Sequence, residues 1–194
     1  MEEFDYIVVG AGSAGCVLAN RLSADPAKRV LVLEAGGKDN WIWFHIPVGY
    51  LFAMGNPRAD WMFQTEKEPG LNGRALNYPR GKVIGGSSSI NGMVYVRGHA
   101  RDFDTWAEMG AQGWSYADVL PYFQRMENWH GGDDAGAAGD PAYRGTDGPL
   151  HITRGPRKNP LFDAFLKAGQ QAGYPVTGDY NGQRQEVFGA MEAT

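Results

Sequence analysis

A short β-α-β pattern at the N-terminus constrains the fold of this chain more than any other feature. Residues 4–9 (FDYIVV) form an apolar, β-branched run of the kind found in strands buried on both faces. The run leads into a G-x-G-x-x-G turn at residues 10–15, and apolar residues at helical spacing follow as far as residue 24. Residues 29–33 (RVLVL) predict a second buried strand that ends on Glu34, about 20 residues beyond the turn. This order of elements predicts a dinucleotide-binding unit.

Each part of this unit has a physical role in holding a dinucleotide. Gly10 permits the tight turn, Gly12 lets the backbone approach a pyrophosphate, and Gly15 allows the helix to pack closely on the strand. The free N–H groups and the positive dipole end of the helix then face the phosphates. Glu34 can accept hydrogen bonds from a ribose 2′-hydroxyl and would repel a 2′-phosphate, which favours FAD or NAD over NADP. These residues leave the choice between FAD and NAD open.

Composition places the chain among ordinary globular proteins. Of its 194 residues 43% are hydrophobic and 21% are charged, and the net charge of −4 argues against nucleic acid and anionic membranes as main partners. No apolar run approaches the ~20 residues that span a bilayer, and no secretory signal precedes the first strand. We therefore expect a cytoplasmic location, with peripheral attachment to a membrane left open. The single cysteine, Cys16, is interpreted as a packed small residue.

A second glycine-rich segment lies at residues 80–95 (RGKVIGGSSSINGMVY). Its paired glycines, three serines and Asn-Gly step offer many donors with little side-chain bulk, which lets the backbone close on a phosphate or a flat polar ring. The alternative is a flexible Gly/Ser linker. Apolar residues threaded through the segment favour a packed loop instead: Val83, Ile84, Ile90, Met93 and Val94.

The remaining elements are expected to be short. Residues 35–60 predict an ordered aromatic excursion, and residues 61–68 and 74–78 predict a β-hairpin around an Asn-Gly turn. Helices are expected over residues 101–109, after a cap at Ser115 and after Asn159-Pro160, and a strand over 149–153. No closing element is expected after residue 174. The spacing of histidines, cysteine and acids predicts no metal site, and no serine lies in a G-x-S-x-G elbow.

Taken together, the two glycine-rich segments resemble those of the glucose–methanol–choline (GMC) family of FAD-dependent oxidoreductases. Residues 81–91, continuing through Tyr95, Gly98 and Asp104, are similar to the first signature pattern of that family. The resemblance runs from Asp5 to about Thr194 and is strongest to the choline dehydrogenases and aliphatic alcohol dehydrogenases. Further similarity lies at residues 60–61 with Thr65, 114–123, 148–150 and 178–182.

The resemblance implies that FAD is the cofactor, with its phosphates and ribose at the first segment and its isoalloxazine at the second. It also implies non-covalent FAD, because Ile90 stands where members with attached FAD have a histidine. Motif and resemblance together predict the following cofactor-binding residues: Gly10, Gly12, Ser13, Ala14, Gly15, Glu34, Ala35, Gly81, Val83, Gly86, Ser87, Asn91, Gly92, Met93 and Val94.

The implied activity is oxidation of a primary alcohol, choline-like or aliphatic, to the aldehyde. A histidine base removes a proton and a hydride passes to flavin N5. That base lies near the C-terminus of family members, so no catalytic residue is expected among the four histidines of this chain. The expected partners are a complementary C-terminal polypeptide of the same protein and a small alcohol, without nucleic acid or an integral membrane segment.

The expected fold is α/β: a Rossmann-like FAD-binding βαβ unit with the start of a second, α+β substrate domain, incomplete without a C-terminal portion. Residues 1–150 are expected to form the N-terminal part of the FAD-binding domain, with the excursion and the flavin-binding loop within residues 35–100. Residues 151–194 are expected to begin the substrate-binding domain. Three alternatives remain: a family lyase that uses FAD structurally, a non-catalytic fragment active only beside its complementary chain, and an NAD-dependent dehydrogenase, in which the second segment would have no role.

Overall fold

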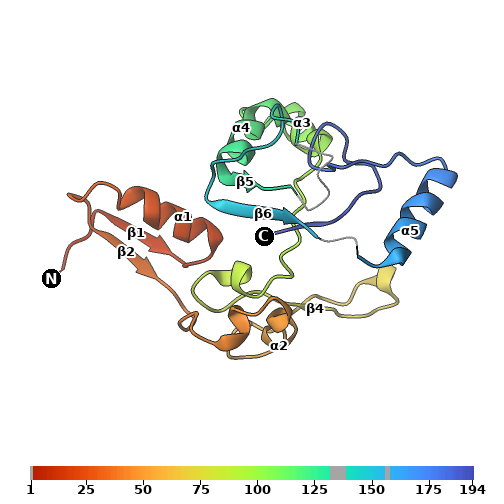
Figure 1. Ribbon diagram of the computed structural model, residues 1–194. Helices are drawn as coiled ribbons and strands as arrows, with labels where there is room; N and C mark the ends of the chain where they lie inside the picture. Colours follow the sequence, from red (N-terminus) through yellow and green to blue (C-terminus); the bar gives the residue numbers. More distant parts are fainter. Residues whose placement is uncertain (1, 132–138, 156–157) are drawn as a thin grey trace. The chain divides into compact units, whose positions relative to one another are not determined.

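The computed structural model describes residues 2–131, 139–155 and 158–194, and Figure 1 shows their helices and strands. Contacts divide the chain into a first unit, which ends at Met93, and a second unit, which begins at Val94. This division differs from the domain boundary expected at residue 150, and the domain assignment stays a prediction. Among the described residues, no helix combines the length and the apolar content needed to cross a bilayer.

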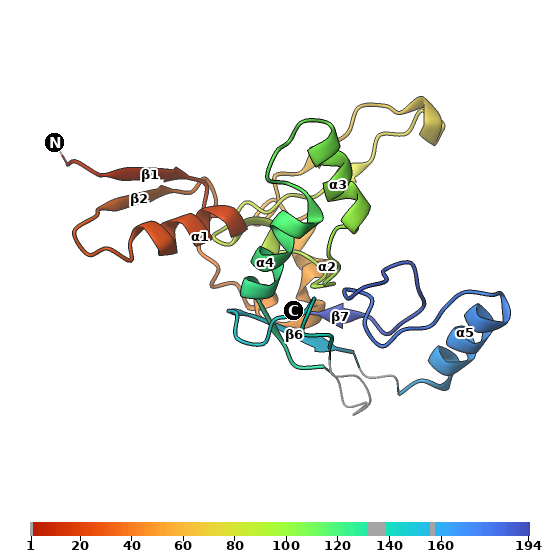
Figure 2. The same cartoon turned by 90° about the horizontal axis from the view of Figure 1, so that it is seen from above.

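The predicted βαβ pattern opens the first unit. Strand β1 (Tyr6–Val9) pairs in parallel with β2 (Val30–Leu33), with Tyr6 opposite Val30. Helix α1 (Ser13–Leu22) connects the two strands and lies along one face of the pair (Figure 2). The helix ends two residues before the predicted end, ahead of the Asp25-Pro26 step, because a residue that precedes proline disfavours helical geometry.

The two strands are more exposed than their apolar sequences predict. Val9 is 83% exposed and Ile7 is 59% exposed, whereas both faces were expected to be buried. Cys16 is exposed as well, which corrects its interpretation as a packed residue. Only Val8 of β1 is buried, because among the described residues α1 covers one face of the pair and the other face stays open.

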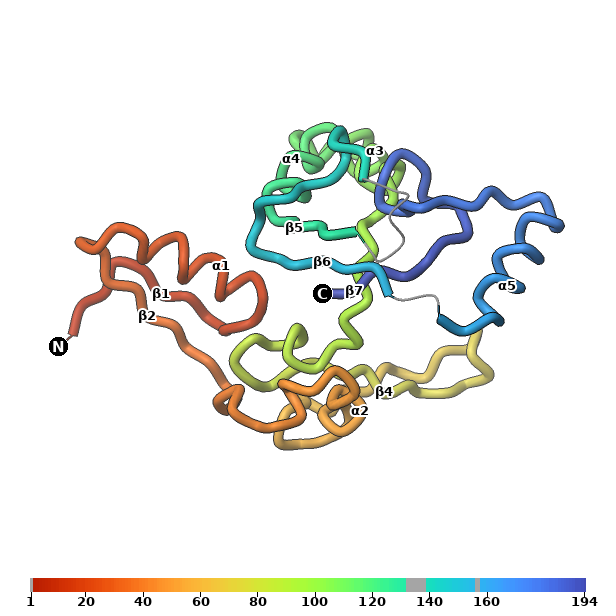
Figure 3. Tube along the Cα trace, in the orientation of Figure 1, coloured from red at the N-terminus to blue at the C-terminus, as the bar shows by residue number. Residues whose placement is uncertain are grey.

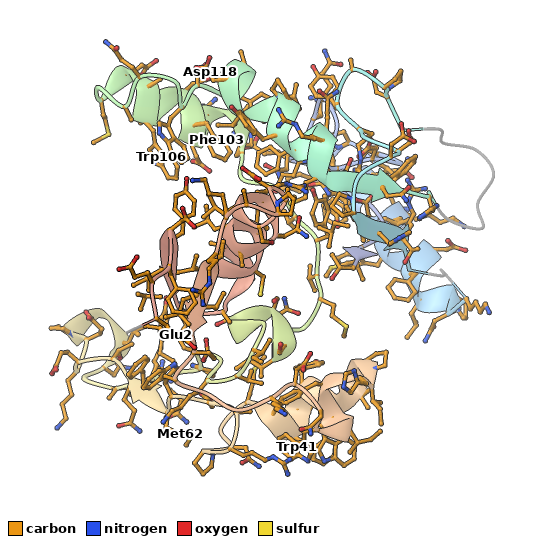
Figure 4. The ribbon with its side chains drawn as sticks, turned by 90° about the vertical axis from the view of Figure 1, so that its left-hand side faces the viewer. Glu2, Trp41, Met62, Phe103, Trp106 and Asp118 are labelled. Carbon is orange, nitrogen blue, oxygen red and sulfur yellow. The ribbon has the colours of Figure 1, made fainter. Side chains whose placement is uncertain are left out.

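The rest of the first unit consists of short elements around a small apolar core. They are η1 (Ile42–Phe44), η2 (Pro47–Gly49), α2 (Tyr50–Ala53), β3 (Phe63–Gln64), η3 (Pro69–Leu71), β4 (Asn77–Tyr78) and η4 (Gly86–Ser89). Ala53, Ala59 and Ile90 form the core, and Trp41 and Phe44 pack against it (Trp41 is labelled in Figure 4). The aromatic segment is therefore ordered, as predicted, and Figure 3 traces its path. The antiparallel β3–β4 hairpin is confirmed, although its strands are shorter than expected.

In the described residues of the second unit, three helices accompany a three-stranded sheet. Helices α3 (Ala100–Glu108), α4 (Tyr116–Met126) and α5 (Pro160–Gln171) begin where the sequence predicts. Ser115 and Asp118 form the expected capping box at the start of α4. The sheet has the order β5 (Glu127–Trp129), β6 (Leu150–Arg154), β7 (Glu192–Ala193), with β5 parallel and β7 antiparallel to β6. No closing element was expected after residue 174. That expectation was wrong, because β7 lies in this segment and pairs with β6.

A buried network of charges holds this sheet together. The Arg144 guanidinium contacts Glu127 Oε2 at 3.0 Å, Glu192 Oε2 at 3.0 Å and Asp179 Oδ1 at 2.8 Å. Arg97 contacts the same oxygen of Glu127 at 2.8 Å. The network therefore ties β5 and β7 to loop residues from three other parts of the unit. Buried charges of this kind require partners, and each carboxylate here has at least one.

Candidate functional site

The first glycine turn presents the N-terminus of α1 without a side-chain cap. Gly10 has φ +91°, a conformation that favours glycine, and Gly12 is the extended residue that precedes the helix. No side chain caps the helix at Gly12, and its first turn, which includes Ser13 and Ala14, carries no acid. The N–H groups of that turn lack intrahelical acceptors. Such a helix end is suited to bind a phosphate.

Gly15 and Gly12 differ in the space that a side chain would find there. A Cβ at Gly15 would overlap the carbonyl oxygen of Gly10, so the helix lies directly on the end of β1. A Cβ at Gly12 would meet nothing closer than Gly86 Cα at 4.0 Å. Open space therefore lies beside Gly12, where the motif predicts a pyrophosphate.

Glu34 lies beside this turn, at the end of β2. Its Oε2 accepts a hydrogen bond from the N–H of Ala11 at 2.7 Å, and its Oε1 accepts one from the N–H of Gly36 at 2.7 Å. Each carboxylate oxygen keeps a second lone pair, which could accept from a ribose hydroxyl. Ala35, also a predicted site residue, follows directly and is exposed. Sequence reasoning missed Ala11, whose role is visible only once the turn and β2 are adjacent.

The second glycine-rich segment packs against the first, backbone to backbone. The N–H of Gly85 donates to the carbonyl oxygen of Ala11 at 2.7 Å, and Gly85 forms a parallel bridge with Gly12. Gly86 is buried with φ +58°, and a Cβ there would lie 2.8 Å from Gly12 Cα. The segment is therefore a packed loop and not a flexible linker. The structure therefore brings together two motifs that lie about 70 residues apart in the sequence.

Hydrogen bonds and close backbone packing within the loop fix its shape. The N–H of Gly81 donates to Ser87 Oγ at 3.1 Å, and a Cβ on Gly81 would overlap the carbonyl oxygen of Gly86. Val83 is fully buried, whereas the Ser87 side chain is exposed.

At the far end of the loop, Asn91 Oδ1 accepts a hydrogen bond from the N–H of Met93 at 2.9 Å. Met93 has φ +60°, and Gly92 lies beside the ring of Tyr50.

One predicted site residue is not placed with the others. Val94 is exposed and belongs to the second unit, where it pairs with Ala193. The other predicted residues all belong to the first unit, where the turn, Glu34 and the second loop adjoin one another.

Each of the four histidines makes a hydrogen bond within its own unit. His45 Nε2 lies 2.8 Å from the carbonyl oxygen of Asp39, and His99 accepts from a backbone N–H at the start of α3. His130 Nε2 and His151 Nδ1 lie 2.9 Å apart on the second unit. We assign none of them as a catalytic base.

The residues of the first unit fit an adenine dinucleotide. An uncapped helix end, open space beside Gly12 and a carboxylate held beside the turn supply an anion site and a ribose acceptor. The sequence profile of the GMC oxidoreductases matches residues 4–194. An oxygen-dependent choline dehydrogenase of Sinorhizobium fredii (strain NBRC 101917 / NGR234) is 58% identical over 98% of this chain and 33% of that protein.

Solved structures show the same similarity. Pyridoxine 4-oxidase from Mesorbium loti has 38% identity and a TM-score of 0.78, over 91% of this chain and 33% of that chain. A formate oxidase variant of Aspergillus oryzae RIB40, studied for FAD modification, has 30% identity and a TM-score of 0.75, over 90% of this chain and 31% of that chain. The chain thus spans about one third of the relatives that it matches.

These matches confirm the predicted α/β fold class, of which the N-terminal, FAD-binding part is present. They also resolve the choice between FAD and NAD, because GMC oxidoreductases are FAD-binding flavoproteins. The chain belongs to the GMC oxidoreductase family.

Proposed function

We propose that this chain is the FAD-binding part of an enzyme that oxidises a primary alcohol to an aldehyde. The observation that carries the proposal is the packing of two glycine-rich backbones at the open N-terminus of α1, beside the carboxylate of Glu34. Choline is the leading substrate candidate, since it is named in a relative with 58% identity, whereas formate is named in a structural relative with 30% identity.

The chain's own residues would bind and orient the cofactor. The N–H groups of the first α1 turn would hold the pyrophosphate, Glu34 would accept from the adenosine ribose, and the loop from Gly81 to Val94 would face the isoalloxazine. FAD, when bound, supplies the hydride acceptor. The base that takes the alcohol proton would come from a C-terminal portion of the protein, which we propose as the partner of this chain.

The proposal also includes non-covalent binding of FAD. Ile90 is 2% exposed and has no nucleophilic atom, which supports non-covalent FAD. Acid precipitation of the full-length protein should then leave the flavin in the supernatant.

The domain assignment is proposed on the sequence alone, with residues 1–150 in the FAD-binding domain and 151–194 opening the substrate domain. The cytoplasmic location is proposed on the same basis.

Turnover of an alcohol panel by the full-length protein tests the proposed activity. We expect oxidation of choline or of a straight-chain primary alcohol to the aldehyde, with oxygen and a dye compared as acceptors. A FAD-loaded protein that oxidises no alcohol and whose flavin is not reduced by any of them would favour the lyase alternative.

The open face of the β1–β2 pair supports the second candidate, in which this segment acts only beside its complementary chain. The intact mass of the purified protein distinguishes one long polypeptide from two associated chains. A single polypeptide of 194 residues that oxidises alcohols would contradict two proposals. These are that a C-terminal portion supplies the base, and that this segment acts only beside a complementary chain.

A further inference from the structure

One carboxylate is buried in the first unit without a cationic partner. Asp60 is 3% exposed and is the one buried charged side chain among the described residues of that unit. None of the ion pairs in the described residues includes it. Burial of an unpaired charge is unfavourable unless hydrogen bonds satisfy it. The position therefore requires a specific set of donors.

Three backbone N–H groups supply those donors. Oδ1 accepts from Met62 and Arg80, both at 3.0 Å, and Oδ2 accepts from Gly55 at 2.8 Å. Met62 (labelled in Figure 4) has φ +59°, which is unusual for a residue with a side chain. Burial acts to raise the pKa of Asp60, but the three N–H donors outweigh it and hold the pKa below its ordinary value. The group is thus a carboxylate at neutral pH.

The Arg80 contact lies at the entrance to the second glycine-rich loop. Asp60 pairs antiparallel with Gly81, and the N–H of Lys82 donates to the carbonyl oxygen of Ala59 at 2.7 Å. The neighbouring Gly81 is the residue whose N–H bonds Ser87. Held in this way, residues 80–82 form the base on which the loop folds back.

From this base the contacts continue to the helix end. Gly81 lies against the carbonyl of Gly86, and Gly86 in turn lies against Gly12 at the start of α1. A shift of the 80–82 backbone would therefore move Gly86 away from the turn predicted to hold the pyrophosphate.

We propose that Asp60 is a positioning residue of the cofactor site, which holds the second glycine-rich loop against the first through the backbone of Arg80. The inference rests on the FAD-binding function proposed above. Asp60 does not touch the cofactor in this account and acts only through residues 80–86. Its sequence neighbourhood predicts no such role, because the three donors are brought to it by the fold.

Two substitutions in the full-length protein separate this role from a general contribution to folding. Asp60→Ala removes all three hydrogen bonds. Asp60→Asn can keep its Oδ1 on Met62 and Arg80 and lose only the Gly55 bond, since that orientation retains two hydrogen bonds and the reverse retains one. Asp39→Ala, at an exposed aspartate of the same unit, is the matched control.

The measurements are the FAD dissociation constant of the apoprotein, its thermal midpoint without FAD, and the visible circular dichroism of the bound flavin. We expect Asp60→Ala to weaken FAD binding by about tenfold or more and to change the flavin dichroism. Asp60→Asn and Asp39→Ala should bind FAD within about threefold of wild type. If Asp60→Ala fails to fold, Asp60→Ser replaces it and should bind FAD more weakly than Asp60→Asn.

Two results would overturn the inference. In one, Asp60→Ala, or Asp60→Ser in its place, binds FAD as tightly as Asp60→Asn and wild type do. In the other, both Asp60 variants lose FAD affinity equally and in step with their thermal midpoints, which would indicate a folding role alone. A wild-type protein that binds no FAD is a distinguishable outcome, since it contradicts the proposed function itself.

Discussion

At the scale of single residues, Gly12 and Gly15 look equivalent in the G-x-G-x-x-G pattern, but the structure shows that they are glycine for different reasons. Gly15 must be glycine because of the chain's own packing, since a Cβ there would overlap the carbonyl oxygen of Gly10. A Cβ on Gly12 would meet no such conflict, because its nearest neighbour, Gly86 Cα, would lie 4.0 Å away. The need for glycine at residue 12 therefore points to a ligand.

Substitution of these two glycines should give opposite results. Gly15→Ala should lower the free energy of unfolding by about 1–3 kcal/mol through overpacking. Gly12→Ala should change it by less than about 0.5 kcal/mol but yield protein poor in flavin. Thermal melting of the apoproteins and the flavin content after purification check both statements. Two stable, fully yellow variants would contradict the phosphate-binding assignment.

Glu34 offers a second test at this scale. Glu34→Gln leaves one carbonyl oxygen to replace two carboxylate oxygens, so Ala11 or Gly36 loses its acceptor and the ribose loses a charged one. We expect FAD affinity to fall by about 1–3 kcal/mol. A fluorescence titration of FAD into the full-length apoprotein measures the change. Unchanged affinity would rule out a ribose contact.

The pH dependence of stability should contain a contribution from Asp60. Its folded-state pKa lies below the unfolded value of about 3.9, so its stabilising effect is fully present above that pH and is lost as pH falls through the folded pKa. The stability difference between wild type and Asp60→Asn should therefore be constant near neutrality and shrink below about pH 4. Urea unfolding at several pH values tests the sign, and a difference that grows in acid would contradict it.

At the scale of elements, helices with local sequence signals were predicted correctly, whereas a strand that depends on long-range pairing was not. The glycine turn, the Asn159 cap and the Ser115–Asp118 capping box act within a few residues, and each begins its helix where expected. Strand β7 depends on pairing with β6 across a long separation, so no local pattern revealed it. The same limit applies to the candidate site. Its motifs were predicted, whereas the contacts of Ala11 and Asp60 required the assembled fold.

Strand β7 should depend on the buried charge of Glu192. Its carboxylate accepts from Trp129 Nε1 at 2.7 Å and Asn181 Nδ2 at 2.8 Å, and it pairs with Arg144. Glu192→Ala would leave the Arg144 guanidinium with fewer partners in a buried site and should destabilise the protein by about 3–5 kcal/mol. Ser115→Ala, at the α4 cap, is a milder reference expected at about 1 kcal/mol. Equal losses of unfolding free energy in Glu192→Ala and Ser115→Ala, measured by chemical denaturation, would contradict this role of the buried charge network.

At the scale of the whole molecule, apolar surface is open on both units. In the first unit it includes Ile7 and Val9 of β1, and in the second it includes Leu161 and Phe165 of α5. Open strand edges promote aggregation, and large exposed apolar areas mark sites of association. Together with relatives about three times as long, this surface supports a C-terminal portion as the partner that covers it.

Residues 1–194 produced alone should therefore be insoluble or loosely packed, and should neither hold FAD nor oxidise an alcohol. Production together with the C-terminal portion should restore flavin colour and activity. A soluble monomer of residues 1–194 that melts cooperatively would show that the segment is an autonomous domain.

A FAD titration of the full-length apoprotein tests whether this chain supplies the FAD-binding site. We predict saturable, stoichiometric binding that Gly12→Ala weakens strongly while the thermal midpoint of the apoprotein hardly changes. Full retention of FAD by Gly12→Ala, or no binding by the wild type, would contradict the claim.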